Sequence, residues 1–252
     1  MVITTYAEAR AVLENPRYVP PPARRDAEPR TLAWLRGAVS RFSTGPEHAR
    51  RRQALEELLT ALDPDELRSA ARALTLERDG AWRGVPTAVL GAVLGVADTD
   101  RLVQAVRAAA PGYLSGAETP EADAAVAELL TLTPAPGRVA RVTLLLQGYA
   151  ATEGLLENTL AHARPGDDAD GLLLAVLRDD PPLKVTRRID RESGAEVVID
   201  LVAANRDAER FGAGRHLTFG AGSRPCPAPR HALALAAGVL AALLETSPAK
   251  SR

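Results

Sequence analysis

One loop near the C-terminal end, which holds the only cysteine of the chain, constrains the fold more than any other feature. It spans residues 216–230, with the sequence HLTFGAGSRPCPAPR. Gly220 and Gly222 allow tight backbone turns, and Arg224 brings a cation beside the sulfur, which favours the thiolate form of Cys226. The apolar run that follows predicts a buried helix whose positive N-terminal end lies just after the cysteine.

A thiolate at such a position is suited to axial ligation of haem iron, whereas the alternative for a lone cysteine is a buried, unreactive thiol. The pattern Phe-Gly-x-Gly-x-Arg-x-Cys-x-Ala resembles the haem-thiolate signature of the cytochromes P450. Two departures from it are Ala228, where the family usually has glycine, and Pro225 directly before the cysteine. The resemblance implies that Cys226 ligates the iron of haem b. Further haem contacts are implied for Phe219, Gly220 and Arg224.

Two prolines follow the cysteine and change the expected environment of the sulfur. In the family, backbone N–H groups after the cysteine donate hydrogen bonds to the thiolate and reduce its electron donation to iron. Pro227 and Pro229 have no N–H. We therefore expect a more strongly donating thiolate and a lower reduction potential of the iron.

A second motif, Gly-Pro-Glu-His-x-x-x-Arg, begins a helix predicted over residues 46–59. His48 and Arg52 are four residues apart, so they lie on one face of that helix and can bind the same anion. By itself this spacing favours an exposed polar stripe. Beside the cysteine loop, it resembles the P450 helix C, whose histidine and arginine contact haem propionates. The resemblance implies further propionate contacts for Arg188 and His216.

The longest periodic segment, residues 138–164, predicts a helix of about 40 Å. Its centre resembles the P450 helix I, which passes over the oxygen-binding face of the haem and carries an acid and a threonine that relay protons. Gly148 fits that pattern, but Ala150 replaces the acid, Ala151 replaces the threonine, and Thr152 stands one position late. Alanine has no exchangeable proton. These catalytic positions therefore either permit close approach of the haem, or Thr152 or the next residue, a glutamate, acts from a locally distorted helix.

A third family motif, Glu-x-x-Arg, is incomplete. Arg178 occupies the arginine position, but Ala175 stands where the glutamate should be. Because a buried arginine without a carboxylate is costly, we expect Asp179 or Asp180 to pair with Arg178, or the guanidinium to be exposed. Further along, residues 196–202 predict a strand that is followed by a turn.

These motifs occur in the family's order over nearly the whole chain. The resemblance implies a mainly α, trimmed cytochrome P450-like fold, with a long central helix over the haem, small β elements, and a cysteine-ligand loop that precedes a buried helix. An aromatic content of 4% also favours helices over sheets. We expect one haem-binding domain over residues 1–252, long enough to form two lobes. Further helices are predicted over residues 5–14, 64–77, 85–96, 98–112 and 121–132.

Charge and hydropathy restrict the partners. A net charge of −1 argues against a nucleic-acid-binding surface. The first residues do not resemble a signal peptide, and no stretch holds about 18 apolar residues, so we expect a cytoplasmic protein without a membrane partner. A ferredoxin-type electron donor would meet Arg215, Arg224 and Arg230. The region that caps the substrate pocket in the family is abbreviated, which would expose apolar surface for a second copy to cover in a homodimer.

Three functions remain open from the sequence. The first is a haem-thiolate monooxygenase that acts on a small molecule of specialised metabolism. The second is a haem-thiolate enzyme with other chemistry: a peroxide-driven oxidation, or a redox-neutral dehydration, rearrangement or cyclisation. The third is a non-catalytic haem-binding or interaction protein. The missing acid and the abbreviated cap favour the second function, and the missing glutamate motivates the third.

Overall fold

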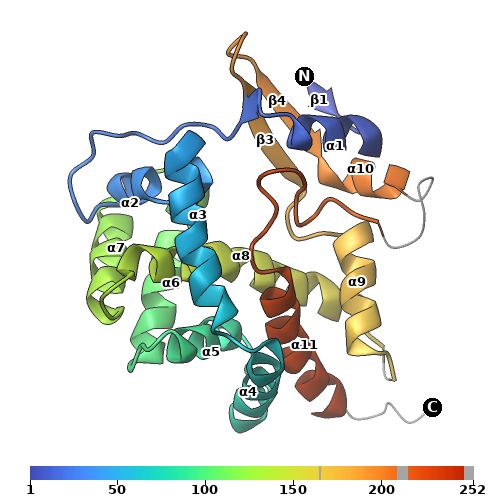
Figure 1. Ribbon diagram of the computed structural model, residues 1–252. Coiled ribbons are helices and arrows are strands. Elements are labelled where there is room, and N and C mark those ends of the chain that lie inside the picture. The colour runs from blue at the N-terminus through green and yellow to red at the C-terminus, as the bar shows by residue number, and fades with distance from the viewer. Residues whose placement is uncertain (165, 209–214, 247–252) are drawn as a thin grey trace. The chain divides into compact units, whose positions relative to one another are not determined.

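The computed structural model describes residues 1–164, 166–208 and 215–246, and these are mainly helical (Figure 1). The chain forms two compact units. Among the described residues, unit 1 comprises residues 1–21 and 154–229, and unit 2 comprises residues 22–153 and 230–246. Each unit is therefore discontinuous in sequence. The assignment of the whole chain to one domain stays a prediction.

Unit 2 is built from helices. Capping side chains set where several of them begin: the Asp98 carboxylate accepts the Arg101 N–H at 3.0 Å, and the Thr119 hydroxyl accepts the Ala122 N–H at 3.2 Å. The elements are α2 (Leu32–Ala38), the short 3-10 helix η1 (Ser40–Phe42), α3 (Gly45–Thr60), α4 (Pro64–Glu77), α5 (Val85–Val93), α6 (Thr99–Ser115), α7 (Pro120–Leu132), the first part of α8 (Arg138–His162), and α11 (Pro229–Thr246) except its first residue.

Three helices of unit 2, α3, α4 and α7, begin and end within one residue of where periodicity predicts them, whereas α6 continues to Ser115, three residues beyond its predicted end. The helix predicted over 85–96 is too long, because α5 ends at Val93. Gly95 has a φ of 86°, and its neighbour Val96 donates its N–H back to the Gly91 carbonyl at 3.0 Å. A left-handed glycine with this reverse hydrogen bond is a common helix stop.

Unit 1 combines a small sheet with helices α1 (Tyr6–Glu14), α9 (Ala169–Asp179) and α10 (Leu201–Asp207) and the last part of α8. The strand order is β1-β4-β3-β2. Its strands are β1 (Val2–Ile3), β2 (Tyr18–Val19), β3 (Val185–Asp190) and β4 (Glu196–Asp200). Strand β1 pairs parallel with β4, and the other neighbours pair antiparallel.

The strand predicted over 196–202, with a turn after it, is wrong at its C-terminal end. Strand β4 stops at Asp200, and the next seven residues form α10. The Asp200 carboxylate accepts the Ala203 N–H at 3.0 Å and so caps the new helix. Because apolar residues lie on both sides of Asp200 in the sequence, periodicity does not reveal that this aspartate caps a helix.

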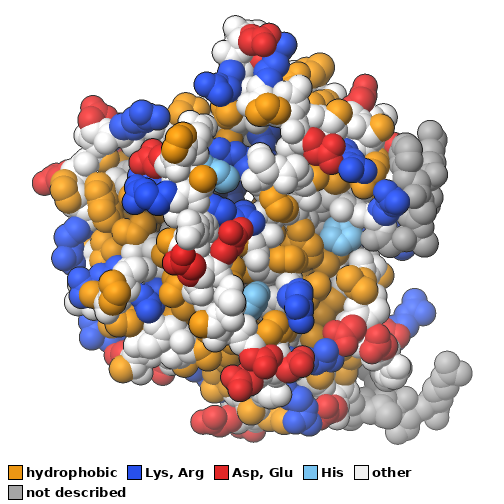
Figure 2. Space-filling model, viewed as in Figure 1, with side chains coloured by type: hydrophobic (Ala, Val, Ile, Leu, Met, Phe, Trp, Pro, Cys, Tyr) orange, Lys and Arg blue, Asp and Glu red, His pale blue; other side chains and the backbone are white. Residues whose placement is uncertain are grey.

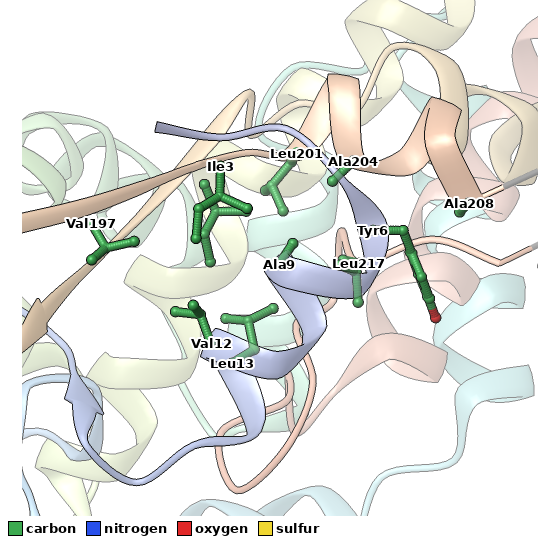
Figure 3. Packing of buried hydrophobic residues seen from close by; sticks show 11 residues of the cluster. Ile3, Tyr6, Ala9, Val12, Leu13, Val197, Leu201, Ala204, Ala208 and Leu217 are labelled. Carbon is green, nitrogen blue, oxygen red and sulfur yellow. The ribbon is translucent and has the colours of Figure 1, made fainter. Parts of the chain in front are cut away.

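The core of unit 1 packs α1 against α10, β4 and the start of the cysteine loop (Figure 3). Ala9, Ile199 and Ala204 are fully buried at its centre, and Leu217 of the loop is 3% exposed. Burial of a leucine side chain contributes about 2 kcal/mol. Apolar packing therefore fixes the beginning of the cysteine loop.

Acidic and basic side chains are interspersed over the visible face of the described residues (Figure 2). Many of them form ion pairs, either within one helix, as Arg10 does with Glu14, or between helices, as Arg72 does with Glu245. This mixture is what a net charge of −1 predicts. Among the described helices, none combines the length and the apolar character that crossing a membrane requires.

Candidate functional site

The cysteine loop of unit 1 is bent by two glycines. Gly220 and Gly222 have φ values of 77° and 71°, which confirms the tight turns predicted there. The loop is closed by the Cys226 N–H, which donates to the Phe219 carbonyl at 2.7 Å. A second bond runs from the Gly220 N–H to the Leu217 carbonyl at 2.8 Å. Both hydrogen bonds hold the backbone that leads to the cysteine.

Gly222 allows a close approach, but to protein rather than to a ligand. A Cβ at this position would lie 2.5 Å from the Leu13 carbonyl oxygen and 2.7 Å from the Glu14 Cα. The tip of the loop therefore rests on the C-terminal end of α1. At Gly220 a Cβ would come no closer than 3.4 Å, to the Arg224 carbonyl.

The Cys226 side chain is half-buried. Its sulfur accepts the Ala228 N–H at 3.4 Å, and α11 begins one residue later at Pro229. A helix N-terminus and an N–H donor both favour a thiolate. Both features suit a ligating cysteine, and ligation by Cys226 stays a prediction. Of the three residues after the cysteine, only Ala228 has an N–H, so one donor of the expected kind remains beside the two prolines.

His216 and Phe219 lie together at the start of the loop, with ring centroids 5.8 Å apart. Burial lowers the pKa of His216. Its Nδ1 is buried and has no hydrogen-bond partner among the described residues. Because buried polar atoms are normally paired, this nitrogen is available for a hydrogen bond that the described residues do not make.

Four arginines of unit 1 were singled out from the sequence, and one of them, Arg215, is exposed. Arg178 donates two hydrogen bonds, each 2.7 Å, to the carboxylate of Asp179, which confirms that a neighbouring acid serves it. This pairing lowers the pKa of Asp179. Arg188, on β3, donates to the Thr186 hydroxyl at 3.0 Å. Arg224 is half-buried in the loop itself.

Unit 2 holds the second group of predicted residues. His48 and Arg52 are both half-buried on α3, so they do not form the exposed polar stripe that was the alternative. The Arg52 Nε donates to Glu56 at 2.7 Å. This ion pair holds the Arg52 side chain on the face of α3 that also carries His48.

The predicted catalytic positions lie in the middle of α8, which is helical over all its residues. Gly148, Ala150 and Ala151 are half-buried, and Thr152 is 4% exposed. A Cβ at Gly148 would meet only Leu90, at 4.0 Å. Packing within unit 2 therefore does not require glycine there.

Glu153, the acid nearest to these positions, is already engaged. Its carboxylate accepts the Gly84 N–H at 2.6 Å and lies 3.8 Å from the Arg83 guanidinium. Gly84 is the N-cap residue of α5, so Glu153 completes the start of that helix. With α8 undistorted, the geometry gives Glu153 a structural partner instead of a proton-relay position.

Sequence reasoning missed one residue that organises the loop. Asn205, on α10, is fully buried and hydrogen-bonds both α9 and the loop. The signal was present, since an asparagine within an apolar run must find polar partners when it is buried.

No family model matches this chain, and no curated protein matches it. Solved structures do. P450BioI, in complex with an acyl carrier protein ligated with hexadec-9Z-enoic acid, is 18% identical, covers 98% of this chain and 85% of its own, and has a TM-score of 0.75. CYP109E1 from Bacillus megaterium, in complex with testosterone, is 18% identical with coverages of 99% and 86% and a TM-score of 0.72.

The P450 monooxygenase TamI is 23% identical, with coverages of 97% and 76% and a TM-score of 0.71. These likenesses span nearly all of the chain at low identity, so they report on its architecture. The long helix α8, the small sheet and the cysteine loop before α11 are the parts that the sequence led us to expect. This chain has the cytochrome P450 fold, in a trimmed form.

Proposed function

We propose that this chain is a haem-thiolate protein that acts on a small molecule, with monooxygenase-type oxidation as its reaction. The observation that carries the proposal is Cys226, whose half-buried sulfur accepts the Ala228 N–H at the start of α11. The Nδ1 of His216, which has no partner among the described residues, also fits a haem contact. On these observations, the residues present suit the group.

Within this proposal, Cys226 would hold the iron of haem b, which supplies redox chemistry when bound. Arg224 and the Ala228 N–H favour the thiolate, and the Phe219 carbonyl fixes the cysteine backbone. Thr152 is the hydroxyl nearest to the family's relay position and would hold the proton to be delivered at its Oγ1. Propionate contacts are proposed for His48, Arg52, Arg188 and His216, and haem contacts for Phe219, Gly220 and Arg224.

The proposed substrate is a carbon-rich small molecule. One relative of the same fold was solved with a fatty acid on a carrier protein, and another with testosterone. A ferredoxin-type electron donor remains part of this proposal, as does a homodimer. Neither partner is needed for the haem assignment itself.

A second function is favoured by the geometry of Glu153. The Glu153 carboxylate is bound to the Gly84 N–H, and the side chains of Ala150 and Ala151 have no exchangeable proton. The usual acid and alcohol are therefore both missing from α8. Peroxide-driven oxidation, or a redox-neutral rearrangement, dehydration or cyclisation, does not need that relay. Turnover with peroxide but not with a reduced ferredoxin would favour this second function.

The first experiment is the absorption spectrum of the purified, dithionite-reduced protein under carbon monoxide, with Cys226→Ser as the matched control. We expect the red-shifted Soret band typical of P450 proteins in the wild type and its loss in the variant. Protein without haem, or a spectrum that the substitution leaves unchanged, would overturn the proposal and favour an interaction protein.

A further inference from the structure

A closed set of hydrogen bonds joins three segments of unit 1. The Asn205 carbonyl oxygen accepts the Leu217 N–H at 2.7 Å, and its amide nitrogen donates to the Thr218 hydroxyl at 2.9 Å and to the Leu177 carbonyl at 3.2 Å. The Thr218 hydroxyl donates to the same Leu177 carbonyl at 2.6 Å. We call Asn205, Thr218 and the Leu177 carbonyl the loop clamp.

The loop clamp is placed where it can control the cysteine. Leu217 and Thr218 lie between His216 and Phe219, and the Phe219 carbonyl accepts the Cys226 N–H at 2.7 Å. A shift of the segment at 217–218 therefore moves the acceptor that fixes the cysteine backbone. At most two peptide units separate the clamp from that acceptor, so the backbone between them can absorb little movement.

The clamp is also rigid. Asn205 is fully buried, and both hydrogens of its amide and its oxygen have partners. In a low-dielectric interior, such a satisfied network holds one geometry and penalises any other. Helix α10, which carries Asn205, is anchored separately, because the Asp207 carboxylate on the same helix accepts the Tyr6 N–H of α1 at 2.9 Å.

We propose that Asn205 and Thr218 are positioning residues that hold the Cys226 sulfur in the orientation required for ligation. This inference rests on the proposed haem-thiolate function. It assigns to the clamp a role beyond stability: with the clamp broken, the chain folds and binds haem, but the sulfur coordinates less often as a thiolate.

The test uses two matched pairs of variants in the full chain. Thr218→Val removes the hydroxyl and Thr218→Ser keeps it. Asn205→Leu removes all clamp bonds of that side chain, and Asn158→Leu is its control. Asn158, on α8 in the same unit, donates to the Asp180 carbonyl at 2.7 Å but has no bond to the loop.

Two readouts are needed. The first is hydrogen exchange at the Leu217 and Cys226 amides, which does not depend on haem. Thr218→Val and Asn205→Leu should each speed exchange at both amides about tenfold or more, because each removes at least two buried hydrogen bonds and the loss of one corresponds to about tenfold. The second is the reduced carbon monoxide spectrum, in which the share of the red-shifted band should fall at unchanged haem content. Thr218→Ser and Asn158→Leu should change neither readout at these positions.

The outcomes separate the two proposals. A wild-type protein without the red-shifted band defeats the haem-thiolate function, and the positioning role with it, whatever the exchange data show. A wild-type band that Thr218→Val and Asn205→Leu leave intact overturns the positioning role alone. The same holds if exchange quickens at Leu217 but not at Cys226, because the clamp would then end at its own segment.

Discussion

At the scale of single residues, the shape of the cysteine loop depends most directly on Gly222. Its positive φ alone would cost an alanine about 1 kcal/mol. In addition, a Cβ would overlap the backbone of α1 at Leu13 and Glu14, which cannot rotate away as a side chain can. We expect Gly222→Ala to lower the free energy of unfolding by about 3 kcal/mol or more in urea titrations.

Gly194 provides the matched control for this substitution. Its φ is 74°, but nothing lies within 4 Å of a Cβ built there. Gly194→Ala should therefore cost only the conformational term, about 1 kcal/mol. Equal losses in the two variants would show that the contact with α1 does not constrain the loop.

The prolines around Ala228 determine how many backbone N–H groups can donate a hydrogen bond to the Cys226 sulfur. Pro229 is the first residue of α11, where a backbone N–H has no partner within the helix. Pro229→Ala supplies such an N–H near the sulfur. If it stabilises the thiolate by about 1 kcal/mol, the reduction potential of the haem-loaded protein should rise by roughly 40 mV.

Spectroelectrochemical titration checks this expectation. Pro225→Ala is the control, because it changes the same loop without adding a donor after the sulfur. A potential that falls or stays constant in Pro229→Ala would contradict the view that these prolines strengthen electron donation by the thiolate.

At the scale of elements, sequence periodicity located the long helices because each carries buried apolar residues at helical spacing, and α4, α6 and α7 also begin with a capping side chain. Periodicity did not locate elements that are too short to show a pattern or that share their apolar character with the neighbouring element. The two-residue strands β1 and β2 have no measurable alternation, and α10 shares its apolar character with the strand before it. The cysteine loop was predicted from its residue types, whereas the clamp at Asn205 depends on partners far away in sequence, which spacing does not reveal.

The junction of α8 and α5 offers a test of how Glu153 is used. Glu153→Ala leaves the Gly84 N–H without its acceptor and should cost about 1–3 kcal/mol of unfolding free energy. Glu153→Gln keeps a carbonyl oxygen for that N–H and should cost less than 1 kcal/mol. If Glu153 is structural, the glutamine variant should also retain nearly all turnover, measured under the conditions that support the wild type.

Thr152→Val is the comparison for that measurement. A strong loss of turnover in Glu153→Gln, with stability unchanged, would contradict the structural role and return the proton relay to Glu153. A loss confined to Thr152→Val would place the relay at the hydroxyl, as proposed.

At the scale of the whole molecule, unit 1 depends on segments from distant parts of the sequence. Its core needs Ile3, Ala9 and Leu13 from the first 21 residues to cover Ile199 and Leu217. Removing the first 21 residues deletes β1, α1 and β2 and withdraws burial worth on the order of 5 kcal/mol. That amount is comparable to the stability of a typical domain.

We therefore expect the chain that lacks residues 1–21 to lose hydrogen-exchange protection at Ile199 and Leu217, and to lose haem with it. Leu102 and Leu129 are fully buried within unit 2, whose helices contain none of the deleted residues, so their amides should stay protected. Mass-spectrometric exchange of the full and shortened chains resolves both pairs of sites. Equal loss at all four amides would mean that unit 2 has no stability of its own, and retention at all four would mean that the N-terminal segment is not needed to order the cysteine loop.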